Sequence, residues 1–194
     1  QPDVLCIQET KVSDKDFPYK TFEDIGYSLR FYGQKSYNGV AIISKNKIAD
    51  IKYGFAGELN QLEISEELHF QKRIISGLIN GIRIINVYVP NGSSLNSEKF
   101  IYKINWLKML NKYLVKQSKR GEPTCLLGDF NIALNDNDIY APDKFKGSIM
   151  ASEIERKMLR EALGSRFKDS FRVFEKLSGH WSWWDYRNNS FELN

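Results

Sequence analysis

The first half of the chain consists of short apolar runs separated by polar loops, which is the pattern of β-strands. Strands are predicted at residues 4–8, at 73–79, at 82–89, and at 38–44 continuing into 48–53. Between two of these runs, Asn80-Gly81 is the strongest short-range signal for a hairpin turn. We therefore expect the strands on either side of it to be antiparallel neighbours.

Apolar residues recur every three or four positions over Asn96–Lys119, which is the period of an α-helix. The apolar stripe consists of Phe100, Ile104, Leu107, Leu110 and Leu114. Ser152 and Glu155 form the pattern of a capping box. They predict that a second helix begins there and ends at Gly164.

This order of elements predicts an α/β fold of the α+β type. Hairpins combined with separate helices favour helices covering two packed sheets over a strictly alternating parallel fold. The chain has 194 residues, enough for one core of good size, so we expect a single domain over residues 1–194. Residues 181–186 (WSWWDY) are expected to form a strand or rim segment with aromatic side chains on both faces.

Composition and charge exclude some classes of protein. With 42% hydrophobic and 27% charged residues, the chain is ordinary for a soluble globular protein and unlike a disordered one. No apolar run approaches the ~18 residues needed to span a bilayer, so we expect no membrane role and a cytoplasmic location. The formal net charge of +4 permits a polyanionic partner without demonstrating one.

The cysteines and histidines form no metal-binding motif. Cys6 and Cys125 lie in predicted buried strands, where a free cysteine behaves as a small hydrophobe. Both are therefore expected to be reduced core residues. His69 and His180 lie far from either cysteine in the sequence, which excludes a Cys/His zinc site. The histidines are expected to be structural or surface residues.

Candidate chemistry begins at residues 128–131 (GDFN), which follow the apolar run 124–127. A buried strand ending here would point Asp129 and Asn131 to the same side. A carboxylate can bind a hard cation or take a proton from water, and an amide can orient an oxyanion without adding negative charge. Phosphate chemistry needs both. The alternative is a plain turn, and the motif alone supports the two interpretations about equally.

Two other predicted strands also end in polar side chains. The run at 4–8 is followed by Glu9, and the run at 82–89 contains Tyr88 and leads to Asn91. Three strands that end in this way are what a site at the rim of a sheet requires. Taken together, the three segments favour an active site over a turn.

With these motifs in order, the sequence resembles the exonuclease III family of abasic-site endonucleases, within the wider endonuclease/exonuclease/phosphatase fold. The matching segments are residues 1–11, 38–41, 73–75, 86–92, 128–131 and 181–187. The Glu-Thr and GDFN motifs are shared across the superfamily, including sphingomyelinases, inositol-phosphate phosphatases and deadenylases. The segment WSWWDYR is more characteristic of the abasic-endonuclease branch.

The resemblance implies a four-layer αββα sandwich of two mainly antiparallel sheets flanked by helices, with the site at one rim. Glu9 corresponds to the ligand of Mg²⁺, with Mn²⁺ as the alternative metal. Asp129 matches the residue that activates or positions the attacking water. Asn131 would hold the scissile phosphate, and Tyr88 would hydrogen-bond it.

Further residues are candidates for substrate contact. The candidate substrate-binding residues are Asn38, Arg73, Asn91, Trp184 and Arg187. Trp184 faces away from Trp181 and Trp183, which are expected in the core. For the basic side chains, contact with phosphate competes with a solvated face, which is commoner for charged residues. These basic residues are Arg73, Lys99, Lys103, Lys144, Lys146 and Arg187.

Parts of the family pattern have no counterpart in these residues. They are a first strand that carries an Asn, an Arg-Ile-Asp segment and a Ser-Asp-His segment. The sequence also starts at Gln1 without an initiator Met, almost directly in a predicted core strand. We therefore expect a fragment that lacks the first strand and the last strands, and negligible incision by a chain confined to these residues.

Three functions remain open at this point. The leading hypothesis is a Mg²⁺-dependent DNA-repair nuclease that cuts 5′ to abasic sites, with the 3′–5′ exonuclease and 3′-phosphatase activities that the resemblance implies. Its partner would be duplex DNA with abasic sites or 3′ ends, and the protein would act as a monomer. The second hypothesis is a phosphoesterase acting on a phospholipid or inositol phosphate, and WSWWDYR argues against it. The third is a catalytically dead DNA-binding fragment, which would gain nothing from the acids Glu9 and Asp129.

Overall fold

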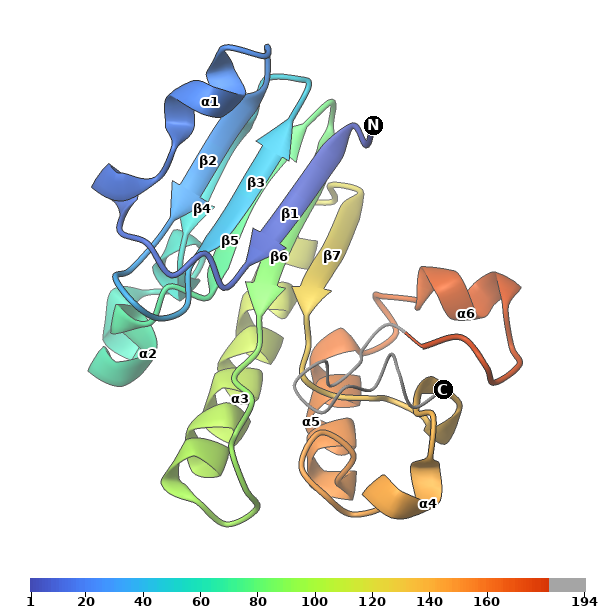
Figure 1. Cartoon of the computed structure of the whole chain (residues 1–194). Coiled ribbons are helices and arrows are strands. Elements are labelled where there is room, and N and C mark those ends of the chain that lie inside the picture. Colours follow the sequence, from blue (N-terminus) through green and yellow to red (C-terminus); the bar gives the residue numbers. More distant parts are fainter. Residues whose placement is uncertain (182–194) are drawn as a thin grey trace.

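Two sheets pack face to face in the computed structural model of the chain, which describes residues 1–181 (Figure 1). The first sheet has the order β1-β3-β2 and consists of β1 (Val4–Gln8), β2 (Ser28–Tyr32) and β3 (Val40–Ser44). The second sheet consists, in order, of β4 (Ala49–Tyr53), β5 (Ile74–Ile79), β6 (Ile82–Tyr88) and β7 (Thr124–Asp129). Within the described residues, β6 and β7 pair in parallel and the other paired strands are antiparallel.

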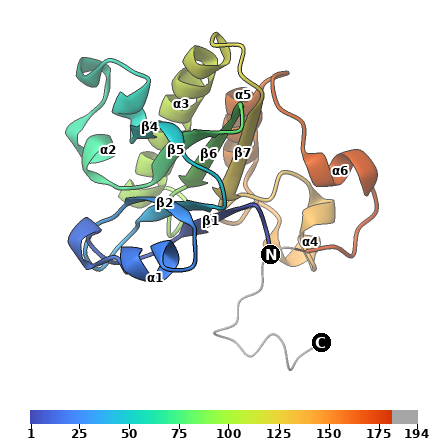
Figure 2. The same ribbon diagram turned by 90° about the horizontal axis from the view of Figure 1, so that it is seen from above.

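Helices lie on both outer faces of the paired sheets, which gives four layers (Figure 2). Helix α1 (Tyr19–Glu23) covers the first sheet, and α3 (Glu98–Ser118) and α5 (Glu153–Leu163) cover the second. The remaining helices are α2 (Glu66–Phe70), α4 (Pro142–Phe145) and α6 (Ser170–Phe174). Short 3₁₀ turns occupy Asp14–Asp16, Phe55–Gly57, Gln61–Glu63 and Asp136–Asp138. The predicted αββα sandwich is confirmed.

Strand β3 contributes to two of the apolar layers that hold the sandwich together. Val40 and Ile42 point into the interface between the sheets, whereas Ala41 and Ile43 pack with Phe17 under α1. Side chains alternate between the two faces of a strand, so a strand buried on both faces needs apolar residues at nearly every position. This accounts for the apolar run VAIIS, in which all five residues are buried.

The third apolar layer lies between the second sheet and α3. The predicted stripe is confirmed, because Phe100, Ile104, Leu107, Leu110 and Leu114 are all buried. Trp106, which is 1% exposed, packs with Leu107, Leu110 and Leu114 against Ile85 and Val87 of β6. The capping box at Ser152 and Glu155 also forms as predicted, and α5 ends at Gly164.

Helix α3 connects two parallel strands and thereby fixes where they end. Parallel neighbours need a crossover connection, and α3 provides the one between β6 and β7. The carboxyl ends of both strands consequently lie side by side, with Tyr88 in register with Asp129. Strand β1 runs toward the same end of the sandwich (Figure 1).

Three expectations about the elements need correction. Residues 48–53 do not continue the preceding strand, because β4 starts after a turn and belongs to the other sheet. Strand β2 was not predicted, since only Leu29 and Phe31 of its five residues are buried. Cys125 is exposed, because β7 is the edge strand of the second sheet as far as the described residues extend. Of the segment 181–186, only Trp181 lies within the described residues.

Gly128 allows β7 to lie close against β6. Its φ is +137°, and a Cβ atom built there would lie 1.9 Å from the carbonyl oxygen of Val87. We expect Gly128→Ala to lower the free energy of unfolding by roughly 2–6 kcal/mol, because backbone strain and overpacking each cost about 1–3 kcal/mol. Urea unfolding of the two proteins measures the difference.

Gly81→Ala is the matched control for this prediction. Gly81 has a φ of +80°, but a Cβ atom there meets nothing within 4 Å. Only the backbone cost of about 1–2 kcal/mol is expected. Equal losses in the two variants would contradict a specific role for the contact with Val87.

Every helix within residues 1–181 is too short or too polar to cross a bilayer.

Candidate active site

Three strands deliver Glu9, Tyr88 and Asp129 to one end of the sandwich. Tyr88 and Asp129 are the last residues of β6 and β7, and Glu9 directly follows β1. Strand β1 packs against both β6 and β7, and the Glu9 carboxylate raises the pKa of both Tyr88 and Asp129. The structure therefore brings together three residues that are well separated in the sequence.

Glu9 presents a charged and accessible carboxylate. Its backbone has a φ of 53°, and its side chain is 43% exposed. Lys11 pairs with it at 2.9 Å, and this partner is the main cause of the lowered pKa of Glu9, outweighing the opposing effect of burial. The phenol of Tyr88 lies near enough to this carboxylate to lower its pKa as well. Glu9 is thus ionised and faces solvent.

Tyr88 is held as a protonated phenol. Burial first, and the charge of Glu9 second, raise the pKa of Tyr88 to about 12. The guanidinium of Arg73 lies over the phenol ring, 4.5 Å from its centre, and its Nη1 donates to the main-chain oxygen of Tyr88 at 3.2 Å. Burial lowers the pKa of Arg73 without removing its charge at neutral pH. Tyr88 can therefore serve as a hydrogen-bond donor beside a cation.

Asn131 orients the carboxylate of Asp129. Its backbone N–H donates to Oδ1 of Asp129 at 2.9 Å, and its Nδ2 donates to Oδ2 at 3.1 Å. Burial and the nearby Glu9 raise the pKa of Asp129, while these hydrogen bonds and Lys103 oppose the rise. The resulting carboxylate is a stronger base than an exposed aspartate and has a fixed direction.

Both protons on the side-chain amide nitrogen of Asn131 are donated to groups within the protein. In addition to the bond with Asp129, its Nδ2 donates to the main-chain oxygen of Val89 at 3.0 Å. Its Oδ1 accepts a hydrogen bond from Nδ2 of Asn91 at 3.1 Å. An amide nitrogen carries only two protons, so a phosphate oxygen could bind it only by replacing one of these acceptors. Asn91 thus joins the site through Asn131.

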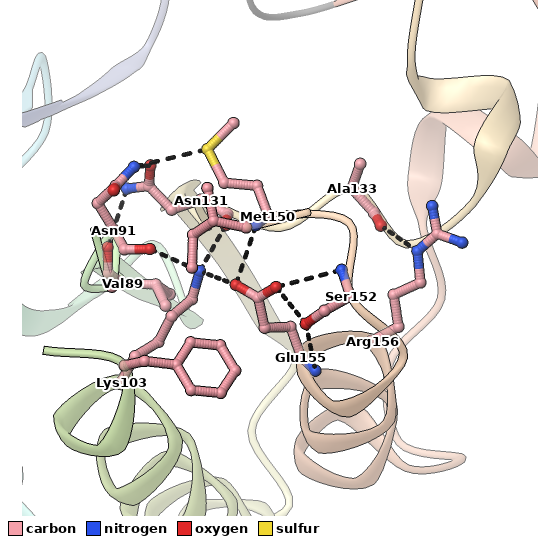
Figure 3. A network of polar contacts seen from close by, with 12 residues as sticks. Val89, Asn91, Lys103, Asn131, Ala133, Met150, Ser152, Glu155 and Arg156 are labelled. Atoms are coloured by element: carbon pink, nitrogen blue, oxygen red, sulfur yellow. Dashed lines mark hydrogen bonds and ion pairs between the residues drawn. The ribbon is translucent and has the colours of Figure 1, made fainter. Parts of the chain in front are cut away.

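A buried ion pair lies beneath the two asparagines, and sequence reasoning missed it (Figure 3). Lys103 on α3 and Glu155 on α5 are both fully buried, with Nζ and Oε1 2.5 Å apart. The expectation of a solvated face is wrong for Lys103. The available signal was its position on the apolar side of α3, one helical turn after Phe100.

A second buried polar residue, Asn86, joins the two sheets behind the site. It lies on β6, is 0% exposed, and accepts a hydrogen bond from Nε2 of Gln8 at 2.7 Å. Its own Nδ2 donates to the main-chain oxygens of Ile7 and Ala41 in the first sheet, at 3.0 and 2.9 Å. An amide within the apolar run at 82–89 was the sequence signal for this contact.

Three of the candidate substrate contacts lie apart from this cluster or outside the described residues. Asn38 is 8% exposed and donates to Oε1 of Gln34 at 3.0 Å. Its main-chain oxygen accepts from the N–H of Lys11 at 2.9 Å, so its loop borders the Glu9 segment. Trp184 and Arg187 lie outside the described residues, and their roles stay predictions.

The donor set at this end of the sandwich fits a hard cation. No group of three or more His, Cys, Asp or Glu side chains within residues 1–181 forms a dedicated cage. Mg²⁺, however, is commonly bound by one or two carboxylates and keeps several waters. The exposed carboxylate of Glu9, with that of Asp129 nearby, matches this need, whereas neither cysteine nor histidine is present to favour a softer metal.

Chemically, the cluster combines an accessible ionised carboxylate, a second carboxylate held in a fixed direction and several hydrogen-bond donors. Glu9 supplies the first, Asp129 the second, and Tyr88 and Arg73 belong to the third group. Donors and a cation at one point stabilise the negative charge that develops on an oxyanion. The arrangement therefore suits the hydrolysis of an anionic ester.

Comparison with known proteins agrees with this geometry. The profile of the Endonuclease/Exonuclease/phosphatase family matches residues 1–194. The chain is 32% identical to exodeoxyribonuclease III of Haemophilus influenzae, covering 100% of the chain and 74% of that relative.

Two solved structures share both fold and sequence with the chain. One is a 3′ phosphatase, NExo, from Neisseria bound to a product DNA hairpin, with a TM-score of 0.90, 35% identity, and coverage of 99% of this chain and 72% of that one. The other is an AP endonuclease from Archaeoglobus fulgidus, with a TM-score of 0.88, 36% identity and the same coverage. Both similarities extend over nearly all of the sequence.

Proposed function

Because the chain belongs to the Endonuclease/Exonuclease/phosphatase family, we propose that it is a metal-dependent DNA phosphodiesterase of the exonuclease III and AP endonuclease type. The observation that carries this proposal is the meeting of Glu9, Tyr88, Asp129 and Asn131 at one end of the sandwich. Similar proteins named for action on DNA support the choice of substrate. The proposal treats residues 1–194 as one domain that acts as a monomer.

Glu9 would hold the divalent cation, Mg²⁺ or Mn²⁺. When bound, the metal supplies Lewis-acid polarisation of the phosphoryl group and neutralises charge on the leaving oxygen. The ion pair between Glu9 and Lys11 must open to free the carboxylate. Lys11 would then be a cation within reach of the DNA backbone.

Asp129 would take the proton from the attacking water. Its raised pKa improves its strength as a base, and its two hydrogen bonds from Asn131 keep both carboxylate oxygens in a defined plane. A base is effective only when it is held within hydrogen-bond reach of the proton it removes. In this role Asn131 orients the base, and it contacts the phosphate by exchanging one internal acceptor.

Tyr88 and Arg73 would receive the scissile phosphate. The phenol of Tyr88 stays protonated to about pH 12, so it remains a donor throughout the physiological range. Arg73 adds positive charge directly above the same ring. Asn91 would complete this group through its contact with Asn131. Charge-assisted donors of this kind stabilise phosphoryl oxygens as negative charge builds up.

The proposed substrate is duplex DNA with abasic sites or 3′ ends, cut on the 5′ side of the abasic site. The 3′–5′ exonuclease and 3′-phosphatase activities would use the same centre, because each removes a group from a 3′ oxygen. Phospholipids and inositol phosphates present the same ester chemistry and form the competing substrate class. The DNA-related names of the similar proteins favour the nucleic acid.

The test is a substrate panel run with the gene product that carries these 194 residues. We expect incision of an abasic duplex and release of phosphate from a 3′-phosphorylated duplex in Mg²⁺, and loss of both in EDTA with recovery when Mg²⁺ is restored. Hydrolysis of inositol phosphates at a higher kcat/KM than DNA would replace the proposed substrate. Incision that continues in EDTA would contradict the proposed metal dependence.

A further inference from the structure

The ion pair between Lys103 and Glu155 is connected directly to the loops that carry the site. Besides its bond to Glu155, Nζ of Lys103 donates to the main-chain oxygen of Asn131 at 2.8 Å and to that of Asn91 at 3.1 Å (Figure 3). An ammonium group has three protons. Lys103 therefore donates one proton to its counterion and one to each of the two loops.

Glu155 is fixed from the opposite side by the start of α5. Its Oε1 accepts from the N–H of Met150 at 3.1 Å, and its Oε2 accepts from the N–H of Ser152 at 3.2 Å and from the hydroxyl of Ser152. The capping-box glutamate thus has a second partner beyond its own helix. The chain of contacts runs from α5 through Lys103 to the loops that follow β6 and β7.

Stability alone does not account for this ion pair. Taking two charges out of water offsets most of their mutual attraction, so a buried pair is weak evidence for a stabilising role. Apolar side chains would fill the same space between α3 and α5. What an apolar side chain cannot do is donate to two main-chain oxygens at once. The arrangement instead fixes the separation of Asn91 and Asn131.

We infer that Lys103 and Glu155 are positioning residues that set the mutual placement of Asn91 and Asn131, and through Asn131 the direction of the Asp129 carboxylate. The inference rests on the proposed function for its effect on catalysis. The placement of the two asparagines by Lys103 follows from the hydrogen bonds and does not depend on the proposed function. Lys103 also lies close enough to Asp129 to lower its pKa, which agrees with this placement.

Lys103→Met is the variant that tests the inference. It removes both donors to the loops while keeping a side chain of similar length. We expect kcat on the abasic duplex to fall by roughly 10–100-fold, because a small misplacement of reacting groups costs about this much. KM should change less than kcat does, since the phosphate contacts proposed for Tyr88 and Arg73 do not depend on Lys103.

Lys52→Met is the matched control. Lys52 forms the other buried lysine–glutamate pair of the described residues, with Glu58 at 2.6 Å, but it lies on β4, at the far edge of the second sheet from β7. It donates to no loop of the site. Glu58 keeps its ion pair with Arg120 at 3.0 Å, so we expect a loss of stability in urea no larger than that of Lys103→Met, with kcat and KM both within about threefold of the unchanged protein.

A second readout does not depend on turnover. In ¹⁵N-edited NMR spectra, the side-chain amide signals of Asn91 and Asn131 should shift or broaden in Lys103→Met and stay in place in Lys52→Met. If Lys103→Met does not fold, Glu155→Gln replaces it. A buried lysine without its counterion tends to lose its proton. The neutral amine then has two N–H donors for three acceptors, which are the main-chain oxygens of Asn91 and Asn131 and the side-chain oxygen at position 155. The same changes in the two amide signals are therefore expected in Glu155→Gln.

The outcomes separate the inference from the proposed function. Unchanged amide signals together with an unchanged kcat in Lys103→Met would overturn the inference. A loss of kcat equal to that of Lys52→Met would also overturn it, since the effect would then follow stability. If the gene product that carries these 194 residues shows no turnover on DNA, the proposed function fails, and the amide spectra still decide whether Lys103 positions the two asparagines.

Discussion

Replacing Asp129 by alanine is expected to lower the rate of DNA incision by roughly 10²–10⁴-fold, the contribution usually made by a positioned general base. The reason lies in the geometry of β7, which ends at Asp129 and presents a carboxylate fixed by two hydrogen bonds from Asn131. Glu9, the nearby carboxylate, cannot replace it, because in Mg²⁺ Glu9 would hold the cation. Single-turnover incision of an abasic duplex in Mg²⁺ measures the effect on the chemical step.

The fold should survive this change. Asp129 is only partly buried, and its loss leaves the N–H groups of Asn131 near solvent. Circular dichroism and urea unfolding should therefore show a folded protein, less stable by about 1–3 kcal/mol at most. Asp3→Ala is the control, because Asp3 is exposed and pairs only with Lys45. Normal incision by the Asp129 variant would show that this residue does not act as the base.

Replacing Glu9 by glutamine is expected to remove metal-dependent activity almost completely. The change preserves shape but removes the negative charge that binds the cation, and a metal contributes several kcal/mol to the stabilisation of a phosphoryl transition state, which corresponds to roughly 10³-fold in rate. Metal binding should weaken in parallel. In the unchanged protein, a metal at ~100 times its Kd should raise the free energy of unfolding by about 2.7 kcal/mol, and Glu9→Gln should lose most of this gain.

Lys11→Met separates the metal from the ion pair in this experiment. It removes the partner that holds Glu9 at 2.9 Å but keeps the carboxylate. Thermal unfolding with and without Mn²⁺ should therefore show metal stabilisation in Lys11→Met and little in Glu9→Gln. If both variants lose the stabilisation by metal, the ion pair is required and the carboxylate alone is not sufficient. If neither loses it, the metal binds elsewhere.

The ends of the strands were predictable because they depend on short-range patterns. Apolar runs and turn residues located β1, β5 and β6 closely, the helical period located α3, and GDFN marked the end of β7. Once β6 and β7 were known to be parallel, the adjacency of Tyr88 and Asp129 followed from the register. The resemblance supplied what the pattern could not, namely that β1 ends at the same rim.

The contacts made by buried polar residues were not predictable in the same way. Lys103 carries the same charge as the exposed lysines around it, and nothing local shows that Glu155, on another helix, is its partner. The burial of Lys103 thus depends on a partner distant in sequence. Strand β2 was missed for another reason: it has only five residues, so the alternation of Leu29, Arg30 and Phe31 is a short signal.

The amide of Asn86 has a mechanical consequence for catalysis. Glu9 follows the last residue of β1 in one sheet, whereas Tyr88 and Asp129 belong to the other, so the proposed metal ligand and the proposed base lie on separate sheets. The apolar surface between them is non-directional and tolerates sliding. The three hydrogen bonds of Asn86 with Ile7, Gln8 and Ala41 oppose sliding of one sheet over the other. Ile7 lies one residue before the end of β1. The hydrogen bonds of Asn86 thus fix how the two parts of the proposed catalytic centre align.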